Sequence, residues 1–232
     1  MWSSPKQVEL YHKASRLKNA GYYEQSLIYT EQLLAEVKEN SLSYAYVQGC
    51  IRAVNLRHLN SIKEAEVDFE AAYKLANHVA DGQAIAAYIL NDRASMYRDK
   101  EASKGIKMVE AAIRKLETEG VTTPDLERFV PADLAYFEAT LARMHAQMGI
   151  PGAAKRMTDA RRSFRVRMQG LPRYEDAFLV ILGWECQMNL RNPTRLISPA
   201  ARFLVTALRQ GKQRELLKLL LEPAYRAGIL GR

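Results

Sequence analysis

The chain has only two cysteines among its 232 residues, Cys50 and Cys186, and they lie far apart within apolar stretches. Neither has a second Cys or a His at the spacing of a metal site, which predicts buried free thiols and no disulfide framework. Such cysteines suit a reducing compartment, so we expect a cytoplasmic protein. No apolar run approaches the roughly 20 residues that span a bilayer, and we expect no membrane association.

Sequence motifs of catalysis are also scarce. The four histidines lack the HExxH pattern of zinc enzymes and any paired spacing of four residues. There is no phosphate-binding GxxxxGK, no GxGxxG after a strand, and no GxSxG. These absences predict a protein that is not an enzyme and that carries no metal, nucleotide or redox cofactor.

One acidic run could be mistaken for a metal site. Glu64, Glu66, Asp68 and Glu70 alternate with other residues over a segment with helical spacing. On a helix these carboxylates spread around most of the surface instead of converging, so we interpret them as a solvated face.

Amphipathic helices account for most of the sequence. Apolar residues recur at spacings of three and four throughout, and alternating β-branched runs are few. With 48% hydrophobic residues, the chain can bury a continuous core. We expect an all-α protein of about ten helices and essentially no sheet. Two helix starts are predicted from Ser–Pro pairs, one at Ser4–Pro5 and one at Ser198–Pro199.

A pattern of helix, turn and helix recurs four times, starting at Leu10, Gly49, Ile89 and Glu138. Small residues occupy positions where two helices would cross closely, as at Ala14, Ala53, Ala72 and Ala142. The predicted turns at Gly21, Asn60, Lys100 and Gly149 are 39, 40 and 49 residues apart. A long connection at residues 120–131 explains the last step.

These residues resemble the tetratricopeptide repeat over about residues 5–165. The departures are a missing Trp in the first helix, Leu33 and Arg161 at usual alanine positions, and Arg93 at a small-residue position. The resemblance implies a right-handed α-solenoid of about four TPR-like helical hairpins plus extra C-terminal helices. Residues 1–168 would form the array, and residues 169–232 would cap or extend it.

The resemblance also implies a groove lined by the first helix of each pair. The groove positions that match are Tyr11, His12, Ser15, Asn19, Arg57, His58, Asn91, Tyr97, Arg98, Arg143 and Gln147. None of them is acidic, which favours an extended or helical segment that carries negative charge. The family's carboxylate clamp for chaperone tails is not expected, because Tyr11 and Ser15 stand at its Lys and Asn positions.

Positive charge is concentrated in the second half of the chain. Residues 1–120 contain 16 Lys or Arg and 16 Asp or Glu, whereas residues 121–232 contain 18 and 10. If this segment is a helix that buries Met157, Ala160 and Phe164, four basic side chains would project into solvent. They are Lys155, Arg161, Arg162 and Arg165. This face could bind an acidic partner, or it could simply be solvated.

The leading hypothesis is an adaptor or scaffold that binds an acidic protein segment. One alternative is a ligand- or peptide-sensing regulator domain of TPR type. Another is an RNA-binding helical repeat that uses the basic C-terminal half, which is second choice because aromatic residues able to stack on bases are sparse there. The leucine-rich residues 215–221 would plug the last repeat or form a homo-oligomer contact.

Overall fold

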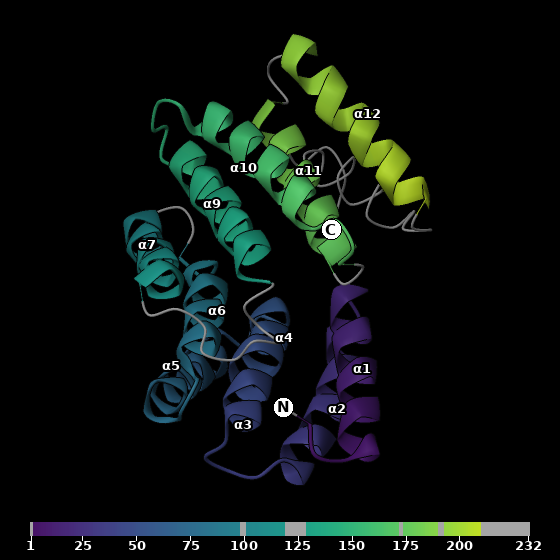
Figure 1. The fold of residues 1–232 in the computed structure, drawn as a ribbon, viewed down its shortest axis with the longest axis vertical. Coiled ribbons are helices and arrows are strands. Elements are labelled where there is room, and N and C mark those ends of the chain that lie inside the picture. The colour runs from purple at the N-terminus through teal and green to yellow at the C-terminus, as the bar shows by residue number, and fades with distance from the viewer. Residues whose placement is uncertain (1, 98–100, 119–128, 172–173, 190–192, 210–232) are drawn as a thin grey trace. The chain divides into compact units, whose positions relative to one another are not determined.

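The computed structural model describes residues 2–97, 101–118, 129–171, 174–189 and 193–209. Within these ranges the chain forms ten helices and no strand, when three consecutive helical segments at residues 42–58 are counted as one (Figure 1). The all-α prediction is therefore confirmed. The chain divides into two compact units, residues 1–130 and 131–232, and each is described by itself.

The first unit contains six of these helices. They are α1 (Pro5–Asn19), α2 (Tyr23–Glu36), α3 (Leu42–Tyr46) continued by a π-helical segment η1 (Val47–Arg52) and α4 (Ala53–His58), α5 (Ile62–His78), α6 (Gln83–Ala94) and α7 (Ala102–Thr118). Helix α1 starts as predicted, because the Ser4 hydroxyl accepts a hydrogen bond from the Gln7 amide and Pro5 takes the first position. Gly21 and Asn60 end α1 and α4 with positive φ angles of 81° and 66°.

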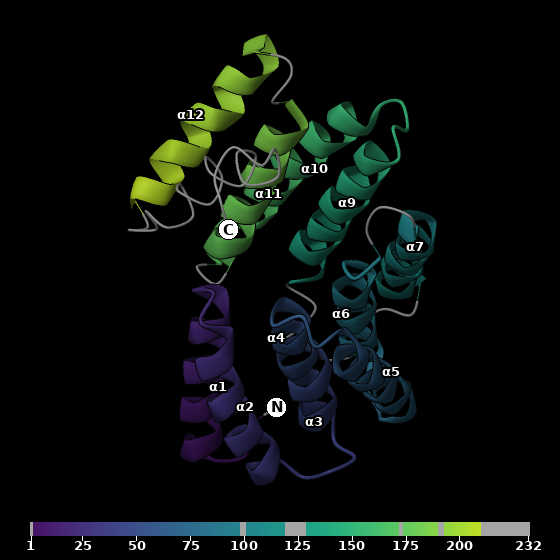
Figure 2. The same ribbon diagram turned by 180° about the vertical axis from the view of Figure 1, so that it is seen from behind.

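Consecutive helices pack in pairs in this unit. Helix α1 contacts α2, α4 contacts α5, and α6 contacts α7 (Figures 1 and 2). Each second helix also contacts the helix that follows it, since α2 reaches η1 and α4, and α5 reaches α6. The first helices touch one another as well, because η1 contacts both α1 and α6.

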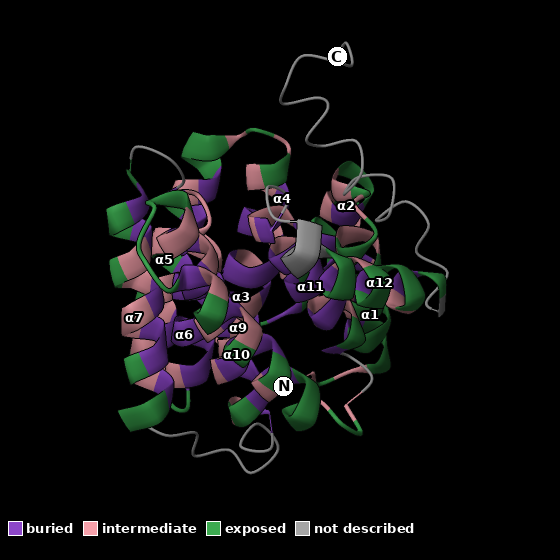
Figure 3. Cartoon of the chain, turned by 90° about the horizontal axis from the view of Figure 1, so that it is seen from above, coloured by how far each residue is buried: buried purple, intermediate pink, exposed green. Residues whose placement is uncertain are grey.

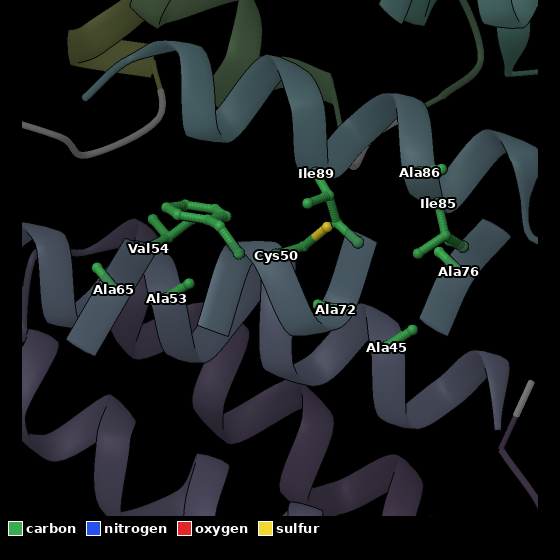
Figure 4. Close-up of a cluster of buried hydrophobic side chains, with 11 residues drawn as sticks. Ala45, Cys50, Ala53, Val54, Ala65, Ala72, Ala76, Ile85, Ala86 and Ile89 are labelled. Atoms are coloured by element: carbon green, nitrogen blue, oxygen red, sulfur yellow. The ribbon is translucent and has the colours of Figure 1, made fainter. Parts of the chain in front are cut away.

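The core of this unit consists of small residues at the helix crossings and a few large ones between them. Ala53, Ala65 and Ala72 are fully buried around Phe69. Figure 4 shows Ile89 of α6 pointing toward Cys50 and Ala72. A Cβ atom added to Gly49 would lie 2.6 Å from Cγ1 of Ile89, so only glycine allows α6 to approach this closely.

Arg93 departs from the small-residue pattern, and the acidic run compensates for it. Its guanidinium binds Glu66 at 2.5 Å and Glu70 at 2.6 Å, and the Tyr97 hydroxyl donates to Glu66 at 2.7 Å. Asp68 in turn pairs with Arg52 of η1. The prediction of a solvated acidic face is therefore wrong for these three carboxylates, because they join α5 to its neighbours.

The second unit contains α9 (Val130–Gln147), α10 (Ala153–Arg167), α11 (Glu175–Asn189) and α12 (Pro193–Arg209). Tyr136 of α9 joins three of them, with its ring centre 6.2 Å from that of Phe164 and 5.7 Å from that of Trp184. The Tyr174 hydroxyl donates to Asp133 at 2.6 Å and fixes the start of α11 against α9.

The helix start predicted at Ser198–Pro199 is wrong, because Pro199 lies inside α12. Proline there removes one backbone hydrogen bond, but the helix continues and buries Phe203 and Ala207. Helix α12 contacts α11, and this packing compensates for the lost bond. The predicted turn at Lys100 and most of the connection at residues 120–131 lie outside the described residues.

The boundary between the two compact units falls between Val130 and Pro131 in the sequence. The predicted boundary after residue 168 separates the repeat array from the C-terminal helices, which is a different division from that into compact units. It therefore stays a prediction.

We predict that Ala72→Arg destabilises the protein by about 3–5 kcal/mol, because it forces an unpaired charge into a closed helix crossing. Ala71→Arg is the matched control, since Ala71 is exposed on the same helix and should change stability by no more than about 0.5 kcal/mol. Urea unfolding followed by circular dichroism measures both variants. Equal stability of the two variants would contradict the helix register described here.

Candidate functional site

The candidate site lies where α1, the continuous helix α3–η1–α4 and α6 approach one another, and we call it the α1–α4–α6 face. Two cations reach from one of these helices to the backbone of the next. Lys18 Nζ of α1 donates to the carbonyl of Cys50 at 3.0 Å. Arg57 Nη1 of α4 donates to the carbonyl of Asp92 in α6 at 3.5 Å. One positively charged side chain thus ties α1 to η1, and another ties α4 to α6.

The Asp92 side chain adds a carboxylate to this face. Burial raises the pKa of Asp92, and the nearby Lys18 and Arg57 charges lower it by a smaller amount. The expectation of an inner surface without carboxylates is therefore wrong at Asp92. Two cations and one carboxylate still leave this part of the face with net positive charge.

Aromatic side chains border the face at its N-terminal end. The Tyr11 ring lies 4.8 Å from the Trp2 ring and 6.1 Å from the Tyr46 ring, measured between centroids. Burial raises the pKa of the Tyr46 hydroxyl well above its usual value, with a smaller contribution from Tyr11. At the other end, the rings of Tyr23 and His58 stack at 4.1 Å.

The cysteine on this face is a poor nucleophile. Cys50 is buried, and burial together with Asp92 raises the pKa of its thiol well above the usual value. Cys186 in the second unit is also buried and free, and its pKa is raised to about 12. Both thiols stay protonated at neutral pH, and the prediction of buried free cysteines is confirmed.

The predicted groove residues lie in different environments in the structure. Tyr11 and Arg57 lie on the α1–α4–α6 face, and Asn19 is exposed at the end of α1. Asn91 is buried, and its Oδ1 atom has no hydrogen-bond partner within the described part of the chain. Arg98 lies outside the described residues.

The prediction that Tyr97 lines the groove from the first helix of the third pair is wrong. Helix α6 ends at Ala94, so Tyr97 is not part of it. Its side chain is buried, its hydroxyl donates to Glu66, and Lys104 Nζ lies 4.0 Å above its ring. Tyr97 is therefore a packing residue and is not available as a groove contact.

Lys18 and Asp92 were missed by the sequence prediction, although the repeat pattern contains a signal for Lys18. Lys18 and Arg57 each stand three residues before a turn residue, Gly21 and Asn60, so they occupy equivalent positions in successive pairs. No sequence spacing relates Asp92 to them, because the three groups meet only across helices.

The second unit carries the other predicted residues. Arg143 of α9 lies over the Trp184 ring, with Cζ 4.9 Å from the ring centre. Lys155, Arg162 and Arg165 of α10 are exposed, as expected from the register of its buried stripe. These three side chains form a basic surface on α10.

Arg161 contradicts the prediction of a solvent-facing side chain. It is buried, and its Nε lies 2.6 Å from Glu185 Oε2 of α11 in an ion pair that is not aligned as a hydrogen bond. Thr158 donates to the other Glu185 oxygen at 2.8 Å. Burial lowers the pKa of Arg161, although its charge is kept by Glu185. Glu185 is the one charged residue in the apolar stretch 177–189 of α11, and this was the sequence signal for a buried cation.

The comparisons with known proteins identify no relative. The chain matches no family model, no curated protein and no solved structure. In the described part of the chain, no three His, Cys, Asp or Glu side chains are grouped as metal ligands. Among the helices described, none is long and apolar enough to span a membrane.

We predict that Arg161→Glu destabilises the protein by about 3–5 kcal/mol, because it leaves Glu185 buried beside a second carboxylate. Arg162→Glu is the matched control, since the neighbouring side chain is exposed and should shift stability by about 0.5 kcal/mol at most. Chemical denaturation of both variants checks this difference. A stable Arg161→Glu variant would mean that α11 does not cover this side of α10.

Proposed function

We propose that the chain is a TPR-like interaction module that binds an acidic protein segment and catalyses no reaction. In this proposal it forms a right-handed α-solenoid of about four helical hairpins with additional C-terminal helices, and acts as an adaptor or scaffold in the cytoplasm. The order of helix contacts in the first unit supports it, because α2 and α5 each pack on the first helix of the next pair. The two buried free thiols support a reducing compartment.

The observation that carries the proposal is the equivalent placement of Lys18 and Arg57. Both cations now donate to neutral backbone carbonyls, at 3.0 and 3.5 Å. A carboxylate of a bound segment would offer each cation an opposite charge as well as a hydrogen-bond acceptor, whereas a backbone carbonyl offers the acceptor alone. Because Lys18 and Arg57 belong to the first helices of successive pairs, α1 and α4, an acidic segment that crosses these helices could reach both.

The absence of catalysis is proposed from the chemistry of the same face. The raised pKa values of Cys50 and Tyr46 keep the thiol and the phenol protonated, so neither is activated as a nucleophile or base. Asp92 is flanked by two cations and has no histidine among the groups that shift its pKa. Recognition of a charged segment is the chemistry that these groups support best.

Replacement of the two cations tests the proposal. The full chain is screened against an array of acidic 12-residue peptides, and the affinity of the tightest peptide is measured by fluorescence anisotropy. We expect Lys18→Ala and Arg57→Ala each to weaken binding about tenfold, the cost of one lost charge-assisted hydrogen bond. Lys107→Ala is the control, because Lys107 is exposed on α7 and carries the same charge.

Two results would overturn the proposal. One is equal loss of affinity in Lys107→Ala, which would indicate general attraction to a basic protein. The other is an array in which acidic peptides bind no better than neutral peptides of the same length. Thermal unfolding of each variant distinguishes lost binding from lost folding, since Lys18 also ties α1 to η1.

A further inference from the structure

The Asp92 carboxylate has no partner of its own on the α1–α4–α6 face. Among the residues that the structure describes, none donates a hydrogen bond to it or forms an ion pair with it. Lys18 and Arg57 are near enough to act on its charge, but each is bound elsewhere. Lys18 donates to the carbonyl of Cys50, and Arg57 donates to the backbone carbonyl of Asp92 itself. The face therefore holds two cations that bind backbone and one carboxylate that no described residue binds.

The surroundings of Asp92 make an unpaired charge unfavourable. Every residue of α6 is either buried or partly buried, and Asp92 is one of the partly buried residues (Figure 3). Burial raises the pKa of Asp92 by more than the charges of Lys18 and Arg57 lower it. The two cations thus compensate the carboxylate incompletely. A positive charge from outside the chain would compensate it further.

The Asp92 charge lies on the side of α6 that faces α3 and η1. It contributes to the raised pKa values of the Cys50 thiol and the Tyr46 hydroxyl, although burial is the larger cause for both groups. Both groups are neutral at neutral pH, so neither supplies a positive charge. A segment that crosses the first helices of successive pairs would therefore meet this carboxylate together with Lys18 and Arg57.

We infer that Asp92 is a specificity-determining residue of the α1–α4–α6 face, and that it binds a Lys or Arg side chain of the acidic segment. This inference rests on the proposed function and specifies the charge pattern of the ligand. The segment carries carboxylates for Lys18 and Arg57 and one cationic side chain beside them for Asp92. Each charge on the face would then meet an opposite charge on the segment.

General attraction to the protein predicts the opposite preference. The chain has a formal net charge of +8, so a Lys added to an acidic peptide should weaken binding at most positions. Tighter binding with Lys requires a carboxylate at a defined place in the binding site. Such a preference would therefore distinguish a contact with Asp92 from the attraction of opposite net charges.

The test starts from the acidic 12-residue peptide that binds the full chain most tightly. Each of its non-acidic positions is replaced in turn by Lys and by Gln, and fluorescence anisotropy measures the affinity of both peptides. We expect a position at which the Lys peptide binds about tenfold more tightly than the Gln peptide, the effect of one ion pair partly shielded from water. Asp92→Asn should remove this preference without weakening the Gln peptide, because the amide keeps the shape of the side chain and removes its charge.

Asp159→Asn is the matched control, because Asp159 is exposed on α10 and its replacement changes the net charge by the same amount. It should keep the preference for Lys. Thermal unfolding at neutral pH provides a second readout. Asp92→Asn should not lower the melting temperature, because burial disfavours the charge that this substitution removes.

Four results would overturn the inference while the proposed function stands. The first is that no position prefers Lys, and the second is a preference for Lys that persists in Asp92→Asn. The third is loss of the preference in Asp159→Asn as well. The fourth is a lower melting temperature of Asp92→Asn with equal weakening of both peptides, which would identify a structural role. Failure of every acidic peptide to bind would overturn the proposed function together with this inference.

Discussion

The close crossing of helices at small residues is the constraint on which the first unit depends. Ala14, Ala53 and Ala72 are fully buried, and Gly49 leaves only enough room for the Ile89 side chain. Side chains this small let the helix backbones approach closely. This approach brings α1, α3–η1–α4 and α6 within reach of one another's polar groups. Lys18 and Arg57 can bind the backbone of a neighbouring helix only because of this approach.

In both units, an arginine at a predicted helix crossing is paired with a carboxylate from another helix. Arg93 and Arg161 stand at positions where the repeat pattern places small residues, and each meets carboxylates from an adjacent helix. A buried guanidinium charge is tolerable only when an opposite charge pairs with it, so the arginine and its acidic partner form one structural element. Such pairs fix which helices are neighbours more specifically than apolar contacts alone.

The helices were predictable from apolar spacing, and so were the cap at Ser4 and the turns at Gly21 and Asn60, because these signals are local. The errors concern residues whose role is set by another helix. Arg161 reads as a surface residue until Glu185 of α11 is placed beside it. Asp92 belongs to the candidate site only because Lys18 and Arg57 reach it from two other helices. Ser198–Pro199 resembles a helix start, but packing of α12 on α11 overrides that preference.

We propose that recognition by the first unit takes place on the α1–α4–α6 face. Amide chemical-shift mapping of the ¹⁵N-labelled full chain, titrated with an acidic peptide that binds it, tests this claim most directly. We expect chemical-shift changes along α1, η1, α4 and α6 that extend from Tyr11 to Lys18 and include Arg57 and Asp92. Shifts confined to α5 and α7, or to the second unit alone, would contradict it.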